Sequence, residues 1–366
     1  MQLSEFRTFG QSGLVVSPLA LGTMTFGTQR WGSDQAQSFE IFKYYYENGG
    51  NFIDTANVYS GGTSETLTGK FIRELAIRDE VVLATKAGFS SGQHPHAGGN
   101  GRKHIHTALN QSLQRLDTDY IDLFWIHMWD RVTPPEEVLL TVSALIQAGK
   151  IRYWGLSNVP AWYAAKIITL ARTSSLPAPI ALQLEYSLVE RSTEQEHLPL
   201  ARNEQLAVQP WSPLGGGFLT GKYDPSNANN VAGKRGAALP DGAPDQGTEK
   251  ERLSGDNPFG DSKFTEKNWA ILNTVKTIAK ACHSSPAQIA LNWLTTMPGV
   301  QAPIIGASKL EQVKSNIAAL SITLDDSQKA DLLKASQPTL SYPSSLFNDR
   351  VQKFVFGGVN VTGGMG

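Results

Sequence analysis

Four side chains that could take part in proton transfer stand where predicted strands end. Asp54 closes the apolar run in NFIDTANVY, and Tyr59 follows five positions later in the connecting loop. Lys86 ends the run VVLATK, and His127 ends YIDLFWIH. A carboxylate, a phenol, an amine and an imidazole are groups that serve in general acid and base chemistry. If the fold brings them together, they form a proton-donating site.

The elements that would position these residues are short apolar runs that alternate with helix-like stretches. Most runs are continuously apolar, which is typical of parallel strands covered by helices. This alternation favours an α/β fold, a (β/α)8 TIM barrel, over an open doubly wound sheet, and the carboxyl ends of barrel strands converge on one face. The expected strands are residues 19–23, 51–54, 81–86, 121–127, 153–157, 180–184, 206–211 and 302–305.

Three segments fall outside this alternation. FRTF and LVVS around GQSG are interpreted as a β-hairpin that acts as a plug or lid. The Gly-rich residues 94–102 follow the third strand, and residues 222–263 are long, rich in Gly, Pro and Asn, and almost without periodicity. A loop of that length is usually functional or disordered. Both loops follow strand ends, so we expect them on the face that carries the four residues.

The whole chain, 1–366, is expected to form one domain, because no repeat and no linker divides it. Its barrel core would span about 6–324, followed by a C-terminal extension at 325–366 that ends in VFGGVNVTGGMG, a tail expected to be flexible. Helix-like stretches followed by glycine or opened by acidic residues fit the usual end signals. They include residues 35–48, 135–148 and, in the extension, 325–335.

The composition is that of an ordinary globular protein. The 366 residues are 40% hydrophobic and 18% charged, with a formal net charge of -1 at pH 7, which gives no electrostatic reason to expect nucleic acid or an anionic membrane as a partner. Cys282 is the only cysteine, so no intrachain disulfide forms, in keeping with a reducing compartment. No signal-like start and no run of about 18 apolar residues is present. We therefore expect a cytoplasmic protein with no membrane span.

Seven ordered blocks carry a resemblance to a known family. They are DTANVYSGGTSE, LATK, YIDLFWIH, AGKIRYWGLSN, LQLEYSL, PWSPLGGGFLTGKY and PIIGASKLEQVKSN. From about Phe6 to Leu324 the chain resembles the aldo-keto reductases, in particular the branch with bacterial oxidoreductases and β subunits of voltage-gated potassium channels. The resemblance implies a TIM barrel that binds NADP(H) without a Rossmann domain. The absence of a G-x-G-x-x-G motif after a strand agrees with this.

The resemblance implies that an aldehyde or ketone is reduced to an alcohol by hydride from the nicotinamide. Tyr59 would donate the proton, and the Lys86 ammonium would stabilise the phenolate that forms. Asp54 would keep Lys86 charged and oriented. His127 would donate a hydrogen bond to the substrate oxygen.

The matching blocks also imply a cofactor site. Ser157, Asn158 and Gln183 would bind the nicotinamide carboxamide, and Trp211 would stack on the ring. Glycines would let backbone amides approach the pyrophosphate, and a helix N-terminus would favour phosphate. The residues implied along the rest of the dinucleotide are Thr23, Ser212, Leu214, Gly216, Lys222, Gly306, Ser308, Lys309, Gln312 and Asn316.

The adenosine end departs from many relatives. Gln312 stands where strictly NADP-dependent members often have arginine, and Ser315 stands where an acid often holds the adenine. Lys309, or an arginine of the long loop such as Arg252, would partly replace the missing charge. NADP(H) remains the expected cofactor. Because no guanidinium fork is present at this position, NAD(H) is considered as a second cofactor.

The small-molecule substrate is expected to be a sizeable, mostly apolar carbonyl compound. Trp31, Phe89, Trp129 and Asp130 fall in loops after strands and would form an aromatic-walled pocket. Asp130 would either bind a substrate hydroxyl or cap a helix. The resemblance leaves the substrate and the oligomeric state open.

Two other functions compete with this interpretation. HPH and HIH, from His94 to His106, imitate metal-ligand spacing, which would suit a metal-dependent hydrolase. However, residues two apart share a face on a strand and diverge on a helix, where His104 and His106 are expected. A non-catalytic nucleotide-binding regulatory subunit would carry the same four residues as a reductase. No metal site is therefore expected, and a turnover assay would separate the other two.

Overall fold

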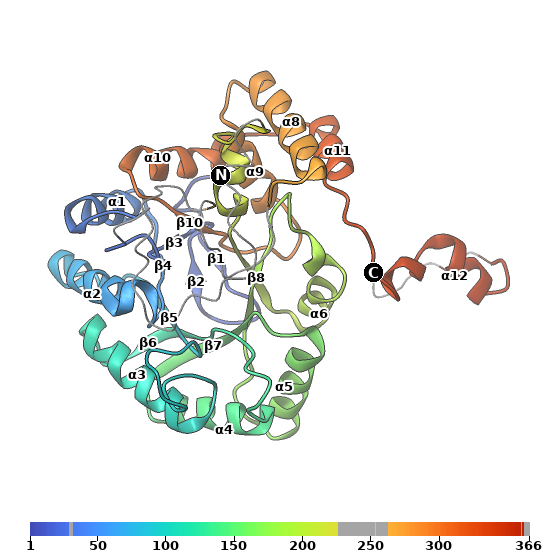
Figure 1. The fold of residues 1–366 in the computed structure, drawn as a ribbon. Helices are drawn as coiled ribbons and strands as arrows, with labels where there is room; N and C mark the ends of the chain where they lie inside the picture. Colours follow the sequence, from blue (N-terminus) through green and yellow to red (C-terminus); the bar gives the residue numbers. More distant parts are fainter. Residues whose placement is uncertain (29–31, 226–252, 254–262, 360, 362–366) are drawn as a thin grey trace.

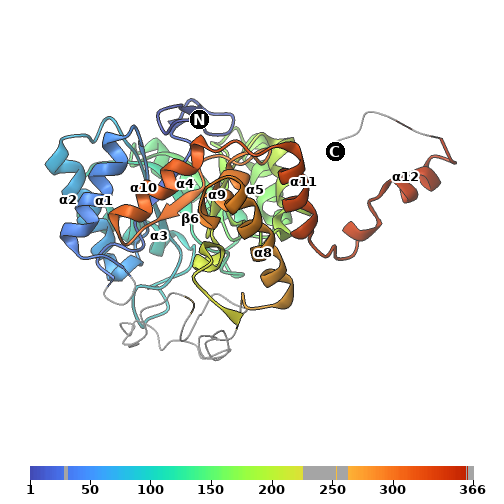
Figure 2. The ribbon, with the colours of Figure 1, turned by 90° about the horizontal axis from the view of Figure 1, so that it is seen from above.

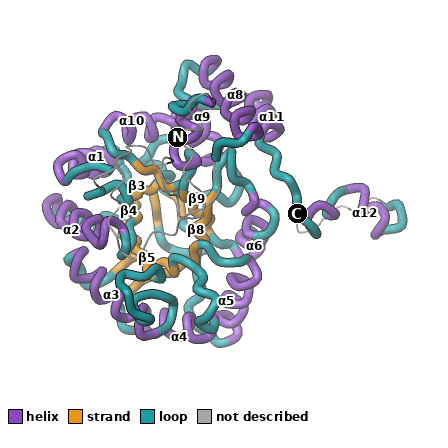
Figure 3. The backbone as a smooth tube through the Cα atoms, in the orientation of Figure 1, coloured by secondary structure: helices purple, strands orange, loops and turns teal. Residues whose placement is uncertain are grey.

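Eight parallel strands form the centre of the fold, as the sequence predicts. The computed structural model of the chain describes residues 1–28, 32–225, 253, 263–359 and 361. Figure 1 looks into the barrel, and Figure 3 shows the strands inside a ring of helices. The strands are β3 (Ala20–Gly22), β4 (Phe52–Asp54), β5 (Val82–Ala87), β6 (Ile121–Ile126), β7 (Ile151–Ser157), β8 (Ala181–Glu185), β9 (Ala207–Trp211) and β10 (Ile304–Gly306).

The sheet runs in sequence order around the barrel, and β10 pairs with β3. The remaining seam, between β9 and β10, is joined just before β10 begins. Val208 and Val300 form a parallel bridge there, and the backbone N–H of Gln301 donates to the carbonyl of Val208 at 2.7 Å. The (β/α)8 TIM-barrel prediction is therefore confirmed.

Helices cover the outside of the sheet, and their ends follow local signals. Asp34 caps the first helix by accepting a hydrogen bond from the backbone N–H of Gln37 at 2.9 Å. The helix expected at 135–148 begins with Pro135 and carries Glu136 and Glu137 in its first turn. The barrel helices are α1 (Gln35–Glu47), α2 (Thr63–Leu75), α3 (Arg102–Leu116), α4 (Pro135–Gln147), α5 (Ala161–Thr173), α6 (His197–Glu204), α8 (Glu266–Ala281), α9 (Pro286–Thr295) and α10 (Leu310–Ala318).

The N-terminal hairpin plugs the barrel at the amino end of the strands. It consists of β1 (Arg7–Thr8) and β2 (Val15–Val16), which pair antiparallel. Between them the ring of Phe9 lies 5.3 Å from that of Phe52 and 6.5 Å from that of Trp125, both inside the barrel. Figure 2 shows the hairpin on the side opposite to the yellow segment that follows β9. The plug therefore leaves the carboxyl end of the barrel open.

Alternate strand residues divide the barrel interior into an apolar layer and a polar layer. In β4, Phe52 lies in an apolar cluster with hairpin residues, and Asp54 follows two positions later. In β5, Val82 and Ala84 belong to the same cluster, and Lys86 follows. Because successive strand side chains face opposite sides, a step of two residues keeps the inward direction. This step places the chemically active side chains in a polar layer toward the carboxyl end.

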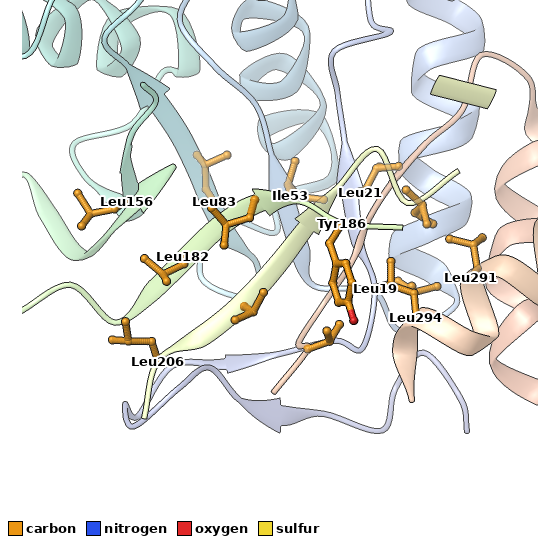
Figure 4. Packing of buried hydrophobic residues seen from close by; sticks show 14 of the residues in the cluster. Leu19, Leu21, Ile53, Leu83, Leu156, Leu182, Tyr186, Leu206, Leu291 and Leu294 are labelled. Atoms are coloured by element: carbon orange, nitrogen blue, oxygen red, sulfur yellow. The ribbon is translucent and has the colours of Figure 1, made fainter. Parts of the chain in front are cut away.

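The outward strand residues form the main hydrophobic core with the helices. Leu21, Ile53 and Leu83 are fully buried members of this core. Figure 4 shows such side chains on neighbouring strands, with Leu291 and Leu294 of α9 facing them from the helical layer. Burying leucine and isoleucine side chains contributes roughly 1.5–3 kcal/mol each. The core thus holds the strands, and with them the polar layer, in place.

The C-terminal extension begins on the barrel and then leaves it. The predicted helix is present as α11 (Asp326–Ala335), and Arg191 donates to the carbonyl of Leu333 at 3.2 Å. Two further helical pieces, η5 (Ser344–Leu346) and α12 (Asp349–Val355), project from the barrel in Figures 1 and 2 and were not predicted. Within the described part of the chain, no helix has the length and apolar character needed to cross a membrane.

The two predicted loops differ in how much of them the structure covers. Residues 94–102 are described; they follow β5, and Arg102 already belongs to α3. Most of residues 222–263 lie outside the described residues, as does the end of the predicted flexible tail at residues 360 and 362–366. Leu253, which is described, packs against the hydrophobic core.

Candidate active site

The four residues come from neighbouring strand ends and from the turn after one of them. Asp54 is the last residue of β4, Lys86 lies next to the end of β5, and His127 directly follows β6. Tyr59 opens the short helix η1 (Tyr59–Gly62). Since β4, β5 and β6 are adjacent in the sheet, the structure brings these side chains together. We refer to the four as the tetrad.

The Lys86 ammonium is the centre of the tetrad and is fully buried. Nζ donates hydrogen bonds to Oδ1 of Asp54, to the backbone oxygen of Thr55 at 2.8 Å and to the hydroxyl oxygen of Tyr59 at 3.2 Å. Burial alone would lower the pKa of Lys86, but the interactions of the ammonium with Asp54 and Tyr59, the carboxylate of Asp54 first, outweigh it and raise that pKa. Because the Tyr59 oxygen accepts from Lys86, its own hydrogen remains available for donation to a ligand.

His127 lies beside the phenol as a neutral imidazole. Its ring is edge-on to that of Tyr59, with centroids 6.0 Å apart, and to that of Phe89 at 4.6 Å. Burial, and after it the charge of Lys86, holds the pKa of His127 well below its usual value of 6.5. Nδ1 is buried and finds no hydrogen-bond partner among the described residues. Nε2 is then the nitrogen through which His127 can donate a hydrogen bond to a ligand oxygen.

Stability is expected to depend on pH through this histidine. Its pKa is lower in the folded chain than the usual 6.5, so below that pH the unfolded chain binds a proton that the folded chain does not. The free energy of unfolding therefore falls as the pH drops below 6.5 and levels off above it. His127→Gln should reduce the slope of the unfolding free energy against pH by up to about 1.4 kcal/mol per pH unit. Urea unfolding between about pH 4.5 and about pH 7.5 measures this slope.

His104 is expected to add to the same slope, because burial lowers its pKa as well. His104→Gln should therefore act in the same direction as His127→Gln. The exposed His283, changed to Gln, is the matched control for losing an imidazole. If the His127→Gln variant kept the wild-type slope, the assignment of a lowered pKa to His127 would be contradicted.

Two amide side chains lie in the polar layer, and one of them is bonded to Asp54. Nε2 of Gln183 donates to Oδ2 of Asp54 at 2.9 Å and to Oε1 of Gln209 at 2.9 Å. Both amides take their inward direction from strand alternation, two residues after Ala181 in β8 and after Ala207 in β9. The sequence analysis included Gln183 but missed Gln209, which the same step of two would have found. Since its amide nitrogen is used within the protein, Gln183 has its Oε1 left for a ligand.

Asn57 is another residue that the sequence analysis missed. It lies between Asp54 and Tyr59 in the chain, is buried, and lines the cavity above the tetrad. Its side-chain oxygen finds no hydrogen-bond partner in the described part of the chain. A buried polar atom without a partner is costly, so an unsatisfied acceptor in a cavity wall points to a ligand donor. Its position inside the DTANVY segment was the available signal.

A cavity of about 2100 Å³ lies above the tetrad. Asp54, Tyr59 and His127 line it, while Lys86 is buried behind them. It reaches from there to the segment after β9 and to the N-terminus of α10. The proposed cofactor residues that line it are Asn158, Gln183, Trp211, Ser212, Leu214, Gly216, Lys222, Gly306, Ser308, Lys309, Gln312 and Asn316. Thr23 and Ser157 are fully buried and do not line it.

The indole of Trp211 is held in place by Asn158. Nε1 of Trp211 donates to Oδ1 of Asn158 at 3.1 Å, and Nδ2 of Asn158 donates to the backbone oxygen of His127 at 3.0 Å and to Oγ of Ser157 at 2.9 Å. These bonds connect the ends of β6, β7 and β9. They fix an aromatic face at the cavity wall, on which a planar ring can stack.

The backbone after β9 turns through several left-handed positions. Ser212 has φ 48°, and Gly215, Gly216 and Gly217 in η3 (Gly215–Thr220) have φ 57°, 67° and 95°. Glycine adopts this region without a Cβ penalty, and such turns leave backbone N–H groups able to bind an anion. At Gly216 an added Cβ would lie 2.7 Å from Cδ2 of Leu253. Gly216 is therefore favoured by its left-handed conformation and lies in close contact with the side chain of Leu253.

At the far end of the cavity, Gln312 closes the N-terminus of α10. Its Oε1 accepts hydrogen bonds from the backbone N–H of Ser308 at 2.8 Å and of Lys309 at 3.2 Å. The side-chain oxygen of Gln312 is therefore hydrogen-bonded to the backbone at the start of its own helix. Lys309 is exposed and places an ammonium at this end of the cavity. Arg252, the other compensating cation considered from the sequence, lies outside the described residues.

The four proposed substrate residues have different positions. Phe89 lines the cavity beside His127. Trp129 does not line it and packs with Trp162 at 5.6 Å and Tyr163 at 6.0 Å between ring centroids. Trp31 lies outside the described residues.

Asp130 organises its own loop. It accepts hydrogen bonds from the backbone N–H of Asn100 at 2.7 Å, of Val132 at 3.0 Å and of Thr133 at 2.9 Å. These bonds, with the one from the Thr133 hydroxyl at 2.6 Å, lower the pKa of Asp130 against the opposing effect of burial. The carboxylate therefore ties the loop after β6 to the loop before α3.

The histidines considered as metal ligands are spread over a loop and a helix. His94 and His96 lie before α3, and His104 and His106 lie within it. The ring of His104 contacts the backbone oxygen of His96 at 3.3 Å through Nδ1. In the described residues, no three His, Cys, Asp or Glu side chains gather in a way that could hold a metal ion.

Comparison with known proteins identifies a family model and several relatives. The family model described as "Aldo/keto reductase family" matches residues 18–337. The chain is 33% identical over 356 residues to a norsolorinic acid reductase of Aspergillus flavus, covering 94% of this chain and 84% of that protein. It is 35% identical over 331 residues to an uncharacterized oxidoreductase of Bacillus subtilis, covering 88% and 92%.

A third relative carries a different kind of name. The chain is 35% identical over 343 residues to a putative voltage-gated potassium channel subunit beta of Schizosaccharomyces pombe, covering 92% of this chain and 93% of that protein. The matched relatives thus include both oxidoreductases and channel subunits.

Proposed function

The chain belongs to the aldo/keto reductase family, and from this premise we propose that it reduces an aldehyde or ketone to an alcohol with NADPH. The family and the reductase and oxidoreductase names among its relatives support an oxidoreductase. One relative is named a norsolorinic acid reductase, which supports reduction as the direction. The cofactor preference, the reaction and the residue roles below are parts of the proposal.

The contact between Tyr59 and Lys86 carries this proposal. The hydroxyl oxygen lies 3.2 Å from the buried ammonium, at the floor of a large cavity. When Tyr59 gives its proton to the substrate oxygen, the ammonium stabilises the resulting phenolate. Asp54 holds the ammonium from the other side, so that its position and charge persist through the step.

His127 is proposed to bind the substrate oxygen next to Tyr59. A neutral imidazole donates one hydrogen bond without attracting the proton that Tyr59 transfers. Negative charge develops on the carbonyl oxygen as hydride arrives, and a donor already in place stabilises that charge more than the neutral ground state. The ring of Phe89 packs against that of His127, and an apolar neighbour strengthens an electrostatic interaction at this position.

The cavity suits a dinucleotide lying across the carboxyl end of the barrel. A bound nicotinamide would supply the hydride. Trp211 offers a stacking face, and Gln183 and Asn57 offer oxygens that have no hydrogen donor among the described residues. The left-handed turn in η3 would hold the pyrophosphate through backbone N–H groups. Lys309 at the start of α10 would face the adenosine end.

Lys309→Ala is expected to test the cofactor preference. A charge-assisted hydrogen bond to a phosphate contributes about 1.5–3 kcal/mol, so loss of the ammonium should raise KM for NADPH about tenfold or more. KM for NADH, which lacks the 2′-phosphate, should change much less. Initial rates with each cofactor at a saturating aldehyde concentration measure both values.

Lys314→Ala is the matched control, because Lys314 lies on the same helix, pairs with Glu311 at 2.8 Å and does not line the cavity. If Lys309→Ala changed KM for NADPH and KM for NADH equally, Lys309 would not bind the 2′-phosphate. An NADH preference in the wild-type chain would overturn the NADPH part of the proposal.

The substrate is proposed to be a sizeable, mostly apolar carbonyl compound, and the chain is proposed to act in the cytoplasm. Support for the substrate class comes from the aromatic wall formed by Phe89 and His127. A panel of aromatic aldehydes, quinones and sugars, assayed with NADPH and with NADH, tests the proposed reaction. If the chain bound NADPH but reduced no compound of the panel, the proposed reaction would be wrong.

The relative named as a potassium channel subunit supports a second candidate, a nucleotide-binding regulatory subunit without turnover. Such a protein would keep the cavity and bind NADPH. The same assay separates the two functions, since a regulatory subunit would bind the cofactor but fail to oxidise it with any carbonyl compound.

A further inference from the structure

Glu65 is a fully buried carboxylate that the proposed reaction does not use. It lies in the first turn of α2, six positions after Tyr59. Its Oε1 accepts a hydrogen bond from the hydroxyl of Thr85 at 2.5 Å. Its Oε2 accepts one from Nε of Arg115 at 2.7 Å. A buried carboxylate is unfavourable unless it is paired and hydrogen-bonded, so these contacts hold it firmly.

Thr85 connects this carboxylate to the strand that carries the tetrad lysine. It directly precedes Lys86 in β5. Successive strand residues face opposite sides, so Thr85 faces the helices while Lys86 faces the barrel interior. The bond from Thr85 to Glu65 therefore holds β5 against the start of α2 at the residue next to Lys86.

Arg115 connects the same carboxylate to the turn that carries Tyr59. The arginine comes from α3 and packs closely on that turn, because an added Cβ on Gly62 would lie 2.8 Å from its Cδ. Ser60, Gly61 and Gly62 have φ values of 50°, 62° and 95°. Three left-handed residues in a row form no regular helix, so the turn depends on its surroundings for its shape.

We propose that Glu65 sets the spacing between the Tyr59 hydroxyl and the Lys86 ammonium. One oxygen holds the strand of Lys86 through Thr85, and the other holds the turn of Tyr59 through Arg115. Glu65 is thus a positioning residue that touches neither substrate nor cofactor. The inference rests on the proposed function, in which Lys86 stabilises the phenolate of Tyr59. The spacing between the two groups matters because a hydrogen bond weakens steeply with length and with poor alignment.

Glu65→Gln removes the charge and nearly keeps the shape. We expect kcat to fall about tenfold or more, because small misplacements of reacting groups are costly, while the Kd for NADPH stays at the wild-type value. The high-pH limb of the kcat profile should move to higher pH, since a more distant ammonium stabilises the phenolate less. Thr85→Val should change kcat in the same direction. Arg115→Lys should retain much of the activity that Arg115→Met loses.

Arg78→Met is the matched control. Arg78 pairs with Asp122 at 2.8 Å, and Asp122 accepts a hydrogen bond from the backbone N–H of Leu83 at 3.0 Å. This pair also braces β5 and β6, but at their amino end, away from the tetrad. The variant should lower Tm and leave kcat and its pH profile unchanged. A loss of stability alone would therefore not imitate the effect at Glu65.

Wild-type kcat and pH profile in a folded Glu65→Gln variant would overturn the inference. If that variant does not fold, the same result in Thr85→Val is decisive. If the wild-type chain reduces no carbonyl compound, the proposed function fails separately. The inference is then judged by crystal structures, and an unchanged distance from the Tyr59 hydroxyl to the Lys86 ammonium in Thr85→Val overturns it.

Discussion

Tyr59→Phe is expected to lower kcat for carbonyl reduction at least about 100-fold, because a general acid contributes roughly that much or more. The substitution removes one oxygen, which accepts a hydrogen bond from Lys86 at 3.2 Å, and leaves the ring in place. The Kd for NADPH should stay within about twofold of wild type, since the loss is confined to the transition state. Steady-state rates with a nitrobenzaldehyde and NADPH, and cofactor titration by tryptophan fluorescence, measure the two quantities.

Tyr46→Phe provides the control for losing a phenolic oxygen. Its hydroxyl donates to Glu80 at 2.6 Å on the surface, and neither residue lines the cavity. This variant should keep wild-type kcat. If Tyr59→Phe retained more than about a tenth of kcat, Tyr59 would not be the proton donor.

Lys86→Met is expected to damage both the reaction and the fold. The phenolate formed by Tyr59 would lose its stabilising charge, so kcat should fall about 100-fold or more. The carboxylate of Asp54 would also remain buried without its cation. Removing one partner of a buried ion pair costs about 3–5 kcal/mol, which chemical denaturation at neutral pH would measure.

A double variant separates these two effects. Asp54→Asn combined with Lys86→Met leaves no uncompensated charge and should recover most of the lost stability. It should not recover kcat, because the ammonium beside Tyr59 is still missing. A single Lys86→Met variant as stable as wild type would show that the ion pair is not buried as described. An active double variant would remove Lys86 from the proposed reaction.

Much of the fold follows from local patterns that the printed sequence contains. Continuous apolar runs separated by amphipathic stretches predict parallel strands and covering helices, and the structure has all eight strands within a few residues of the expected positions. The hairpin followed from two short apolar runs around GQSG. By contrast, α12 was missed, because its seven residues carry too little periodicity to stand out from a Gly-rich tail.

The order of elements and the types of residue at strand ends were enough to single out Asp54, Lys86 and His127, because parallel barrel strands all end on one face. The contacts that these residues make were not accessible in this way. The bond between Gln183 and Gln209 joins two neighbouring strands, and the bond between Glu65 and Arg115 joins two helices 50 positions apart in the chain. Their contacts depend on strand register and on how each helix is rotated against its neighbours, and only the closed, packed barrel sets these quantities.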